Sequence, residues 1–173
     1  MRRVAILTVS DRASRGDYED LSGPAIESWL RTAIASPFEC LLRIVPDGVE
    51  SVRDALIALC DHDSADLVLT TGGTGPSPRD LTPEAMGEVI TTELPGFGDL
   101  MRQVSLAQVP TAILPRQTAG IRGRTLIINL PGKPSAIDLC LDPVFPAVPY
   151  CLDLIGAGRI ETDPAVCVSF RPA

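Results

Sequence analysis

Three short runs of apolar residues stand out in the first half of the chain, at residues 4–9, 40–45 and 67–71. Runs of this length with few polar positions are typical of strands that are buried on both faces of a sheet. The segments between them have apolar residues at helical spacing, namely Ile26, Trp29, Leu30 and Ala33, followed by Val52, Leu56, Ile57 and Leu59. This alternation of strands and helices predicts parallel strands that are joined by right-handed crossovers.

Proline marks where several of the predicted helices begin. The first helix is predicted to open at residues 22–24, because proline is tolerated in a first turn. The third is predicted to open with Thr82 as its N-cap and Pro83 at the first helical position. A fourth helix follows over residues 95–107.

The second half of the chain predicts a hairpin at residues 120–130, then a short helix at 135–141 and a longer one at 144–155. Residues 160–170 are expected to form an edge strand or an extended arm. The order of the strands stays open at this point. If the first strand is central, the loops after the first and third strands flank a topological switch point, where open α/β sheets bind ligands.

Composition limits the classes of protein that fit this pattern. A chain of 173 residues without low-complexity segments predicts one domain over residues 1–173. The net charge of −7 argues against sequence-independent binding to nucleic acid or to an anionic membrane. The first apolar run is broken at residues 10–12 and no segment approaches a transmembrane span, so we expect a cytoplasmic protein.

The cysteines and the single histidine bear on metal binding. The five cysteines form no CxxC pair, and His62 is the only histidine, so a zinc site is not expected. Apolar neighbours predict that the cysteines are buried free thiols in a reducing compartment. These residues are Cys40, Cys60, Cys140, Cys151 and Cys167.

Basic residues are concentrated in one stretch, residues 112–134, which contains no acid. Its members are Arg116, Arg122, Arg124 and Lys133. Such a stretch beside a glycine turn fits a wall that faces a phosphate. A biased overall composition would account for most of these arginines as well.

A glycine-rich loop, TTGGTG at residues 70–75, directly follows the third predicted strand. Backbone N–H groups in such a loop can approach and bind an anion such as phosphate. The loop is neither a Walker A motif nor a GxGxxG fingerprint. Taken alone, it is equally consistent with a tight turn that binds nothing.

Two further polar loops also follow predicted strands, at residues 10–16 and 129–134. The carboxyl ends of parallel strands meet at one edge of a sheet, so the three loops together predict a binding cleft. Asp47 and Asp80 follow the second and third strands and would lie beside this cleft. They could share Mg²⁺ with the phosphates of a nucleotide. Alternatively, Asp47 could form the turn at Gly48, and Asp80 could cap the next helix.

No pair of nucleophile and general base is visible in the chain. There is no Ser/His/Asp set, and His62 follows a helix where we expect it to be solvated. The chemistry that fits depends on positioning and charge neutralisation rather than on a covalent intermediate. Phosphoryl and nucleotidyl transfer are reactions of that kind.

Taken in this order, the segments resemble the MogA-type molybdopterin adenylyltransferases, a branch of a wider molybdopterin-binding superfamily. The matching segments are SDRASRGDYED (10–20), DLVLTTGGTGPSPRDLTPEA (66–85), PGFGDLMRQVSLAQVPTAILPRQ (95–117), LIINLPGKPSAI (126–137), VPYCLDLI (148–155) and ETDPAVCVSFRP (161–172). The glycine loop marks only the superfamily. The segment at 95–117 and the C-terminal segment mark this branch.

The resemblance implies a fold and a reaction. The fold is a three-layer α/β domain around a mostly parallel sheet, assembled as a homotrimer. The reaction transfers AMP from Mg·ATP to the terminal phosphate of molybdopterin and releases pyrophosphate. The product is then handed to a partner protein that inserts molybdenum.

The resemblance also assigns residues. Asp47 and Asp80 match the two acidic active-site positions of the family and would serve catalysis and Mg²⁺ binding. The positions that match the nucleotide-binding and pterin-binding loops are Arg12, Ser14, Gly16, Thr71, Gly72, Gly73, Thr74, Gly75, Asn129, Pro131, Gly132 and Pro134. Relatives differ at Lys133, which is expected to make a supporting contact to a phosphate.

Two other functions fit the same residues. One is a related enzyme of this fold that hydrolyses a different phosphate ester or a pyrophosphate. The other is a non-catalytic module that binds molybdopterin or serves as a scaffold. The two acids and the glycine loop favour catalysis, because a scaffold has no need of them.

Overall fold

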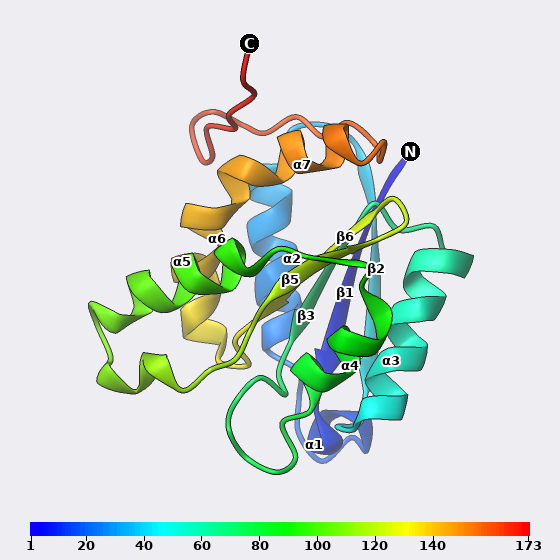
Figure 1. Cartoon of the computed structure of the whole chain (residues 1–173), viewed down its shortest axis with the longest axis vertical. Coiled ribbons are helices and arrows are strands. Elements are labelled where there is room, and N and C mark those ends of the chain that lie inside the picture. Colours follow the sequence, from blue (N-terminus) through cyan, green and yellow to red (C-terminus); the bar gives the residue numbers. More distant parts are fainter.

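A six-stranded sheet forms the centre of the computed structural model, which describes residues 1–173 (Figure 1). Its strands are β1 (Arg2–Val9), β2 (Phe38–Val45), β3 (Leu67–Thr71), β4 (Thr92–Glu93), β5 (Ala119–Arg122) and β6 (Thr125–Leu130). Their spatial order is β2-β1-β3-β6-β5-β4. The first four in this order run parallel, whereas β5 and β4 are antiparallel to their neighbours.

Helices cover both faces of the sheet and make three layers (Figure 1). They are α1 (Asp11–Ser14), α2 (Ser22–Ala33), α3 (Val49–Ile57), α4 (Thr82–Val89), α5 (Pro95–Leu106), α6 (Ile137–Val144) and α7 (Val148–Leu154). Helices α3 and α4 pack on one face, and α2, α5, α6 and α7 pack on the other. Alternate residues of each strand point to opposite faces, so Val4 and Ile6 join one core while Ala5 and Leu7 join the other.

The central position of β1 resolves the order of the strands. β1 pairs with β2 on one side and with β3 on the other. The topological switch point that the sequence left conditional is therefore present, and the loops after β1 and β3 flank it. The predicted hairpin is confirmed as β5 and β6, with Gly123 in the turn at a φ of +56°.

Two local predictions need correction, and a third is narrowed to one of its two alternatives. Thr82 is the first residue of α4 rather than its N-cap, and its side chain donates a hydrogen bond to the carbonyl of Gly72 instead. The last helical region is divided by a 3₁₀ turn at Phe145–Ala147, because Pro146 and Pro149 lack the N–H that a continuous helix needs. The C-terminal tail forms one isolated bridge, between Ile34 and Thr162, and is an extended arm.

One helical region passes a test of length and composition for a membrane span, although the sequence predicted that no segment approaches one. Consecutive helical segments over Pro134–Leu154 make 21 residues that contain an 18-residue window with a mean hydropathy of 1.2, which is enough to cross a membrane by length and composition. Core helices of globular proteins pass the same test. Here Ile137, Leu141 and Phe145 are fully buried in the core between this region and the sheet.

The cysteines largely follow the prediction. All five are free thiols; Cys60, Cys140 and Cys167 are buried, and Cys40 and Cys151 are half-buried. Burial raises the pKa of Cys40 and of Cys60 to about 11 in each case, so these thiols stay protonated at neutral pH. His62 is exposed, as expected.

Candidate active site

The loops that follow the parallel strands are bonded to one another at one edge of the sheet. The Ser10 N–H donates to the carbonyl of Val45, at 2.9 Å, and joins the loops after β1 and β2. The Thr71 hydroxyl donates to the carbonyl of Pro131, at 2.7 Å, and joins the loops after β3 and β6. The convergence predicted for these loops is therefore confirmed.

The glycine loop is packed closely against its surroundings. Gly72 and Gly73 have φ values of +94° and +67°, which residues with a side chain rarely adopt. A Cβ on Gly72 would collide with the carbonyl oxygen of Val9, and one on Gly73 would collide with the hydroxyl of Thr82. The glycines therefore let β3 turn sharply between β1 and α4.

Asp47 and Asp80 line the same cavity, which has a volume of about 320 Å³. The other lining residues are Val9, Ser10, Asp11, Arg12, Gly73, Ser77 and Arg79. Asp11 and Asp47 bind each other's backbone: the Asp11 N–H donates to Asp47 Oδ2, and the Asp47 N–H donates to Asp11 Oδ1, both at 3.0 Å. The cavity is therefore walled by carboxylates from three separate loops.

The Asp80 carboxylate does not cap α4. Its Oδ2 accepts a hydrogen bond from the Ser77 N–H at 3.0 Å and closes the turn that precedes the helix. The same oxygen lies against Gly75, where a Cβ would come within 2.7 Å of it. Asp80 is thus held by its own loop, with its carboxylate at the cavity.

Like charges dominate the electrostatics of this cavity. Burial, and secondly the negative charge of Asp80, raise the pKa of the Asp47 carboxyl above its ordinary value. Two arginines line the cavity, Arg12 and Arg79; the one paired with its carboxylates is Arg79, which contacts Asp11 and has Nη2 at 3.8 Å from Asp47 Oδ2. The Arg79 side chain is 65% exposed, so its guanidinium can leave this position without unfolding anything.

The donor set fits a magnesium ion that arrives with a nucleotide. No group of three or more His, Cys, Asp or Glu side chains is arranged to hold a metal ion. Mg²⁺ is usually bound through one or two carboxylates together with phosphate oxygens and water. Asp47 and Asp80 supply two carboxylates in one cavity, and a cation there would relieve the repulsion that raises the pKa of Asp47.

A second cavity, of about 170 Å³, lies on the other side of the loop after β1. It shares Val9, Ser10 and Arg12 with the acidic cavity. Its other lining residues are Thr8, Ala13, Tyr18, Asp20, Ser22, Thr71, Gly72 and Gly132. The two cavities are adjacent, with Arg12 in the wall between them.

The second cavity is bordered by the start of α2. Asp20 Oδ1 accepts hydrogen bonds from the backbone N–H groups of Ser22 and Gly23, at 3.0 and 3.1 Å, and so satisfies the first turn of this helix. Asp20 Oδ2 accepts from the Thr8 hydroxyl at 2.7 Å. The Ser22 hydroxyl donates to the carbonyl of Gly132 at 2.8 Å. The cavity therefore has a polar wall whose groups are already paired.

The sequence-predicted site residues divide into two groups. Those that line one of the two cavities are Arg12, Asp47, Thr71, Gly72, Gly73, Asp80 and Gly132. Those that line neither are Ser14, Gly16, Thr74, Gly75, Asn129, Pro131, Lys133 and Pro134. The second group therefore lies outside the cavity walls, and its members differ in their surroundings.

Asn129 illustrates this second group. Its side chain is fully buried, and Nδ2 donates to the Thr70 hydroxyl at 3.0 Å while Oδ1 accepts from the Thr118 N–H at 3.3 Å. The amide therefore joins β6 to β3 and to the segment before β5, and its contacts are internal. Lys133, in contrast, is exposed on the loop after β6.

The basic wall suggested by residues 112–134 is not formed. Arg116 is paired with Glu84 beside the glycine loop, whereas Arg122 is paired with Asp61. Arg122 and Arg124 lie at the hairpin turn, at the opposite edge of the sheet from the two cavities. Residues 112–134 run along β5 and back along β6, so their basic side chains are divided between the two opposite edges of the sheet.

Sequence reasoning missed three charged residues of the site: Asp11, Asp20 and Arg79. Asp11 comes directly after β1, as Asp47 comes after β2, and this position could have singled it out. Asp20 precedes the predicted helix start by two residues, which fits a capping carboxylate. No pattern in the sequence indicates that Arg79 contacts Asp11, because the two residues are 68 positions apart and meet only in the folded chain.

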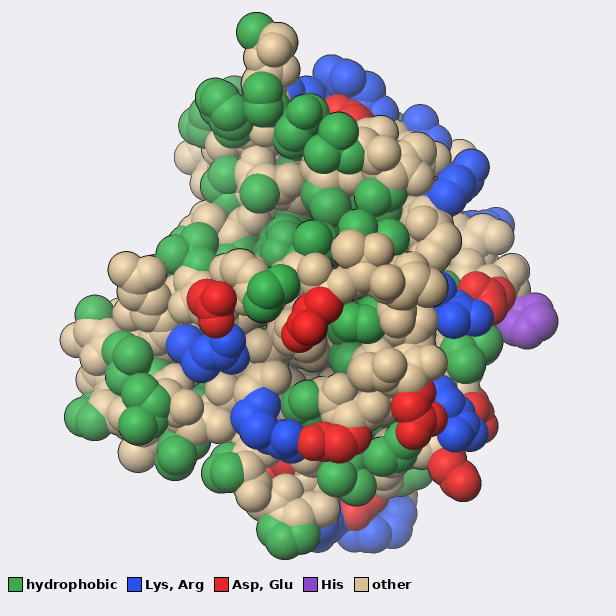
Figure 2. Space-filling view, in the orientation of Figure 1, with side chains coloured by type: hydrophobic (Ala, Val, Ile, Leu, Met, Phe, Trp, Pro, Cys, Tyr) green, Lys and Arg blue, Asp and Glu red, His purple; other side chains and the backbone are tan.

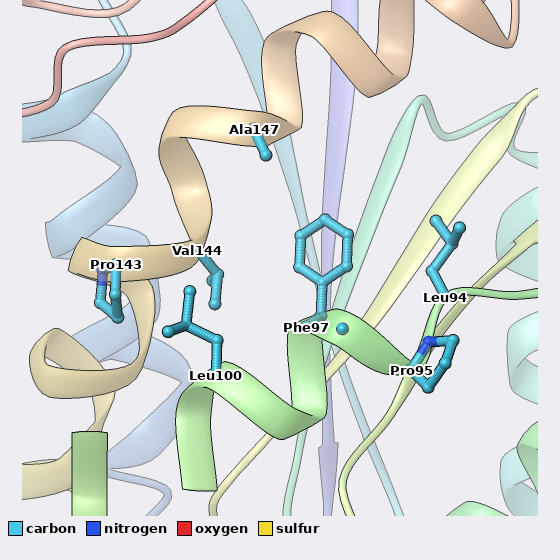
Figure 3. A pocket seen from close by; sticks show the side chains of 8 residues that line it. Leu94, Pro95, Phe97, Leu100, Pro143, Val144 and Ala147 are labelled. Atoms are coloured by element: carbon cyan, nitrogen blue, oxygen red, sulfur yellow. The ribbon is translucent and has the colours of Figure 1, made fainter. Parts of the chain in front are cut away.

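A third cavity, of about 300 Å³, is apolar and lies between α5 and the region of α6 and the following 3₁₀ turn (Figure 3). Leu94, Phe97, Leu100 and Val144 point toward this space. It shares no lining residue with the two polar cavities. On the face shown in Figure 2, hydrophobic side chains gather in the upper part, and red and blue side chains form a band across the lower part.

Known proteins resemble this chain over most of its length. Residues 5–150 match the family described as "Probable molybdopterin binding domain". The molybdopterin adenylyltransferase of Helicobacter pylori strain 26695 is 53% identical, with 98% of this chain and 96% of the relative covered. The enzyme of the same name from Escherichia coli K12 is 46% identical, with 98% and 93% covered.

Solved structures agree with the sequence comparison. The molybdopterin biosynthesis enzyme MoaB from Thermus thermophilus superposes with a TM-score of 0.83 at 43% identity, covering 93% of this chain and all of that one. The molybdopterin biosynthesis Mog protein from Mycobacterium ulcerans gives a TM-score of 0.82 at 38% identity, covering 90% and 99%. The α/β fold expected from the resemblance is confirmed. With the loops, the acids and the fold in agreement, the chain belongs to the molybdopterin-binding family that includes these molybdopterin adenylyltransferases.

Proposed function

We propose that this chain is a molybdopterin adenylyltransferase, which transfers AMP from Mg·ATP to the terminal phosphate of molybdopterin and releases pyrophosphate. The observation that carries the proposal is the placement of Asp47 and Asp80 in one cavity beside Gly73, at the carboxyl edge of the parallel strands. The reaction itself is inferred from its relatives, which are named molybdopterin adenylyltransferases. The acidic cavity is assigned to Mg·ATP and the adjacent cavity to the phosphate end of molybdopterin.

The reaction is a displacement at phosphorus. An oxygen of the molybdopterin phosphate forms a bond to the α-phosphorus of ATP, and the bond from that phosphorus to pyrophosphate breaks. Mg²⁺, held by Asp47 and Asp80, would neutralise the charge that develops on the phosphates. Positioning and charge neutralisation account for most of the rate enhancement in such transfers.

The chain's own residues orient the two substrates. Arg12 lines both cavities, so its guanidinium can contact the donor phosphates and the acceptor phosphate together. Arg79 must withdraw from Asp11 and Asp47 when a metal-bound nucleotide enters, and its exposure allows this movement. The backbone of Gly72 and Gly73 lies between the cavities and keeps the two phosphates close, since no side chain intervenes.

We propose further that residues 1–173 form one catalytic domain, that the enzyme works as a homotrimer in the cytoplasm, and that a molybdenum-insertion protein receives its product. Support for the trimer and the partner comes from the family resemblance alone. The five free thiols fit a reducing compartment. Size-exclusion chromatography with light scattering tests the trimer directly.

Replacing Asp80 with Asn tests the proposed function. Asn keeps an oxygen that can accept the Ser77 N–H, so the fold should persist. The lost charge should lower the rate of AMP transfer on the order of 10²–10³-fold, as the removal of one electrostatic stabiliser commonly does. The measurement is formation of adenylylated molybdopterin from ATP, with release of pyrophosphate followed in parallel.

The control is Asp54→Asn, which removes an exposed carboxylate on α3 that lies outside both cavities and should leave the rate unchanged. Near-normal AMP transfer by the Asp80→Asn protein would overturn the proposal. Hydrolysis of ATP or of a dinucleotide without transfer would support the hydrolase alternative. Calorimetry that detects binding of neither Mg·ATP nor molybdopterin would support the scaffold alternative.

A further inference from the structure

One arginine outside both cavities bonds to both ends of the loop that carries Asp80. Arg116 lies in the segment before β5, and its guanidinium donates to two backbone carbonyls. Nη2 donates to the carbonyl of Asp80 at 2.6 Å, and Nε donates to the carbonyl of Gly75 at 3.3 Å. The six-residue segment 75–80 is therefore closed at its first and last residues by one side chain.

The same guanidinium is anchored to α4. Nη1 donates to Glu84 Oε1 at 2.5 Å, and Nη2 donates to Glu84 Oε2 at 3.1 Å, so the pair is bidentate. Glu84 lies in the first turn of α4, and its hydrogen bonds from Arg116 lower the pKa of its carboxyl. The Arg116 N–H also donates to the carbonyl of Thr74 at 2.7 Å. The glycine loop, the Asp80 turn and α4 thus share one point of attachment.

We propose that Arg116 is a positioning residue for adenylyl transfer, which holds Asp80 at the acidic cavity by fixing segment 75–80 to α4 through Glu84. Arg116 lines neither cavity, so it acts through Asp80 and the glycine loop rather than on a substrate. The proposal rests on the role proposed above for Asp80. An arginine is needed here because its guanidinium makes four hydrogen bonds, two to the Glu84 carboxylate and two to backbone carbonyls, whereas an ammonium has only three N–H donors.

A purely structural ion pair is the competing explanation, and the chain contains a matched example. Arg122, at the other end of β5, makes a bidentate pair with Asp61 and donates to the carbonyl of Val89 at 3.1 Å. Both pairs are partly exposed, with side-chain exposures of 40% and 42% for Arg116 and Glu84 against 27% and 44% for Arg122 and Asp61. Because both pairs are bidentate and similarly exposed, we expect them to contribute similar, modest amounts to stability. The two arginines therefore differ mainly in the backbone that they bind: Arg116 binds the segment that carries Asp80, and Arg122 binds Val89 at the end of α4.

The test compares Arg116→Ala with Arg122→Ala in the full chain, with ATP and molybdopterin as substrates. We expect similar, small decreases in melting temperature for the two variants. We expect kcat for AMP transfer to fall roughly 10–100-fold for Arg116→Ala alone, because misplacing a reacting group by about 1 Å can cost 10²-fold. The KM for ATP should change less than kcat, and Arg116→Lys should recover only part of the rate.

A double-mutant cycle distinguishes a positioning role for Arg116 from a purely structural one. If Arg116 acts through Asp80, Arg116→Ala should cause little further loss of rate in an Asp80→Asn background. Equal rate losses for Arg116→Ala and Arg122→Ala, or full additivity with Asp80→Asn, would overturn the inference. An unchanged rate for Arg116→Ala, with Asp80→Asn inactive, would overturn it while leaving the proposed function intact. Full activity of Asp80→Asn would overturn both.

Discussion

At the scale of single residues, Asp47 shows what it costs to group carboxylates in the acidic cavity. Its carboxyl is partly buried and lies beside Asp11, Asp80 and the exposed guanidinium of Arg79. Burial and the charge of Asp80 raise its pKa, so the ionised form is less favourable in the folded chain than in the unfolded one. Folding with Asp47 charged therefore costs stability, and a bound cation would recover it.

This cost predicts a dependence of stability on pH. Because the folded pKa of Asp47 lies above its ordinary value of 3.8, the folded state holds more protons than the unfolded state between those two values. This contribution to stability is complete below the ordinary pKa and is lost as the pH rises through the folded pKa. We expect Asp47→Asn to melt at the same temperature as the natural protein near pH 3 and at a higher temperature at pH 7.

Asp61→Asn is the control of opposite sign for this prediction. Arg122 lowers the pKa of Asp61, so its charge favours folding above the ordinary pKa, and its removal should lower the melting temperature at pH 7. Thermal melts between pH 3 and pH 8 measure both effects. A lower melting temperature for Asp47→Asn at pH 7 would contradict this account of Asp47.

At the scale of elements, the start of α4 is built differently from the sequence prediction. Thr82 is fully buried, and its hydroxyl donates to the carbonyl of Gly72 at 3.0 Å while its N–H donates to the carbonyl of Gly73 at 3.0 Å. Both groups support the glycine loop rather than the helix. The loop is therefore held by α4 from one side and by Arg116 from the other.

Thr82→Val should show what this support contributes. Valine keeps the shape of threonine but leaves the Gly72 carbonyl without its partner, which we expect to cost about 1–3 kcal/mol in the free energy of unfolding. The matched control is Thr32→Val on the exposed side of α2, where the hydroxyl donates to the carbonyl of Ser28. Urea denaturation should show a change only for Thr82→Val, and equal changes in the two variants would argue against a special role for Thr82.

At the scale of the whole molecule, the two cores are carried by the same strands. Alternate residues of β1, β3 and β6 enter opposite cores, so neither core can form without the sheet that both share. Trp29, the only tryptophan, packs against Phe145 with ring centroids 4.8 Å apart, in the core beside α2 and α6. Its fluorescence therefore reports on one core alone.

This arrangement predicts that a destabilising substitution in one core also lowers the stability of the other core. Leu56 on α3 is fully buried in the core opposite to Trp29, and Leu56→Ala should cost about 2–5 kcal/mol. We expect Trp29 fluorescence and far-ultraviolet circular dichroism to report the same lowered urea midpoint. An unchanged fluorescence midpoint, with an earlier loss of helix signal, would mean that the two cores unfold separately.

The parts of the molecule that sequence could predict are those fixed by local pattern. The strands β1, β3 and β6 can be recognised in the sequence as apolar runs because both of their faces are buried. The loop residues that line the cavities could be predicted as well, but the ion pairs around them join distant residues, such as Arg116 with Glu84, 32 positions apart. Several arginines lie near suitable acids in the sequence, so only the folded geometry decides which pairs form.

The reciprocal hydrogen bonds between Asp11 and Asp47 have a consequence for how this site can evolve. Each carboxylate accepts a hydrogen bond from the backbone of the other residue's loop, so each side chain both lines the cavity and holds the neighbouring loop. A substitution that removes the acceptor oxygen at either position, such as alanine, leaves a backbone N–H of the other loop without its partner and so loosens the join between the two loops. We therefore expect positions 11 and 47 to be conserved together in relatives that use the cavity, and to change together in relatives that do not.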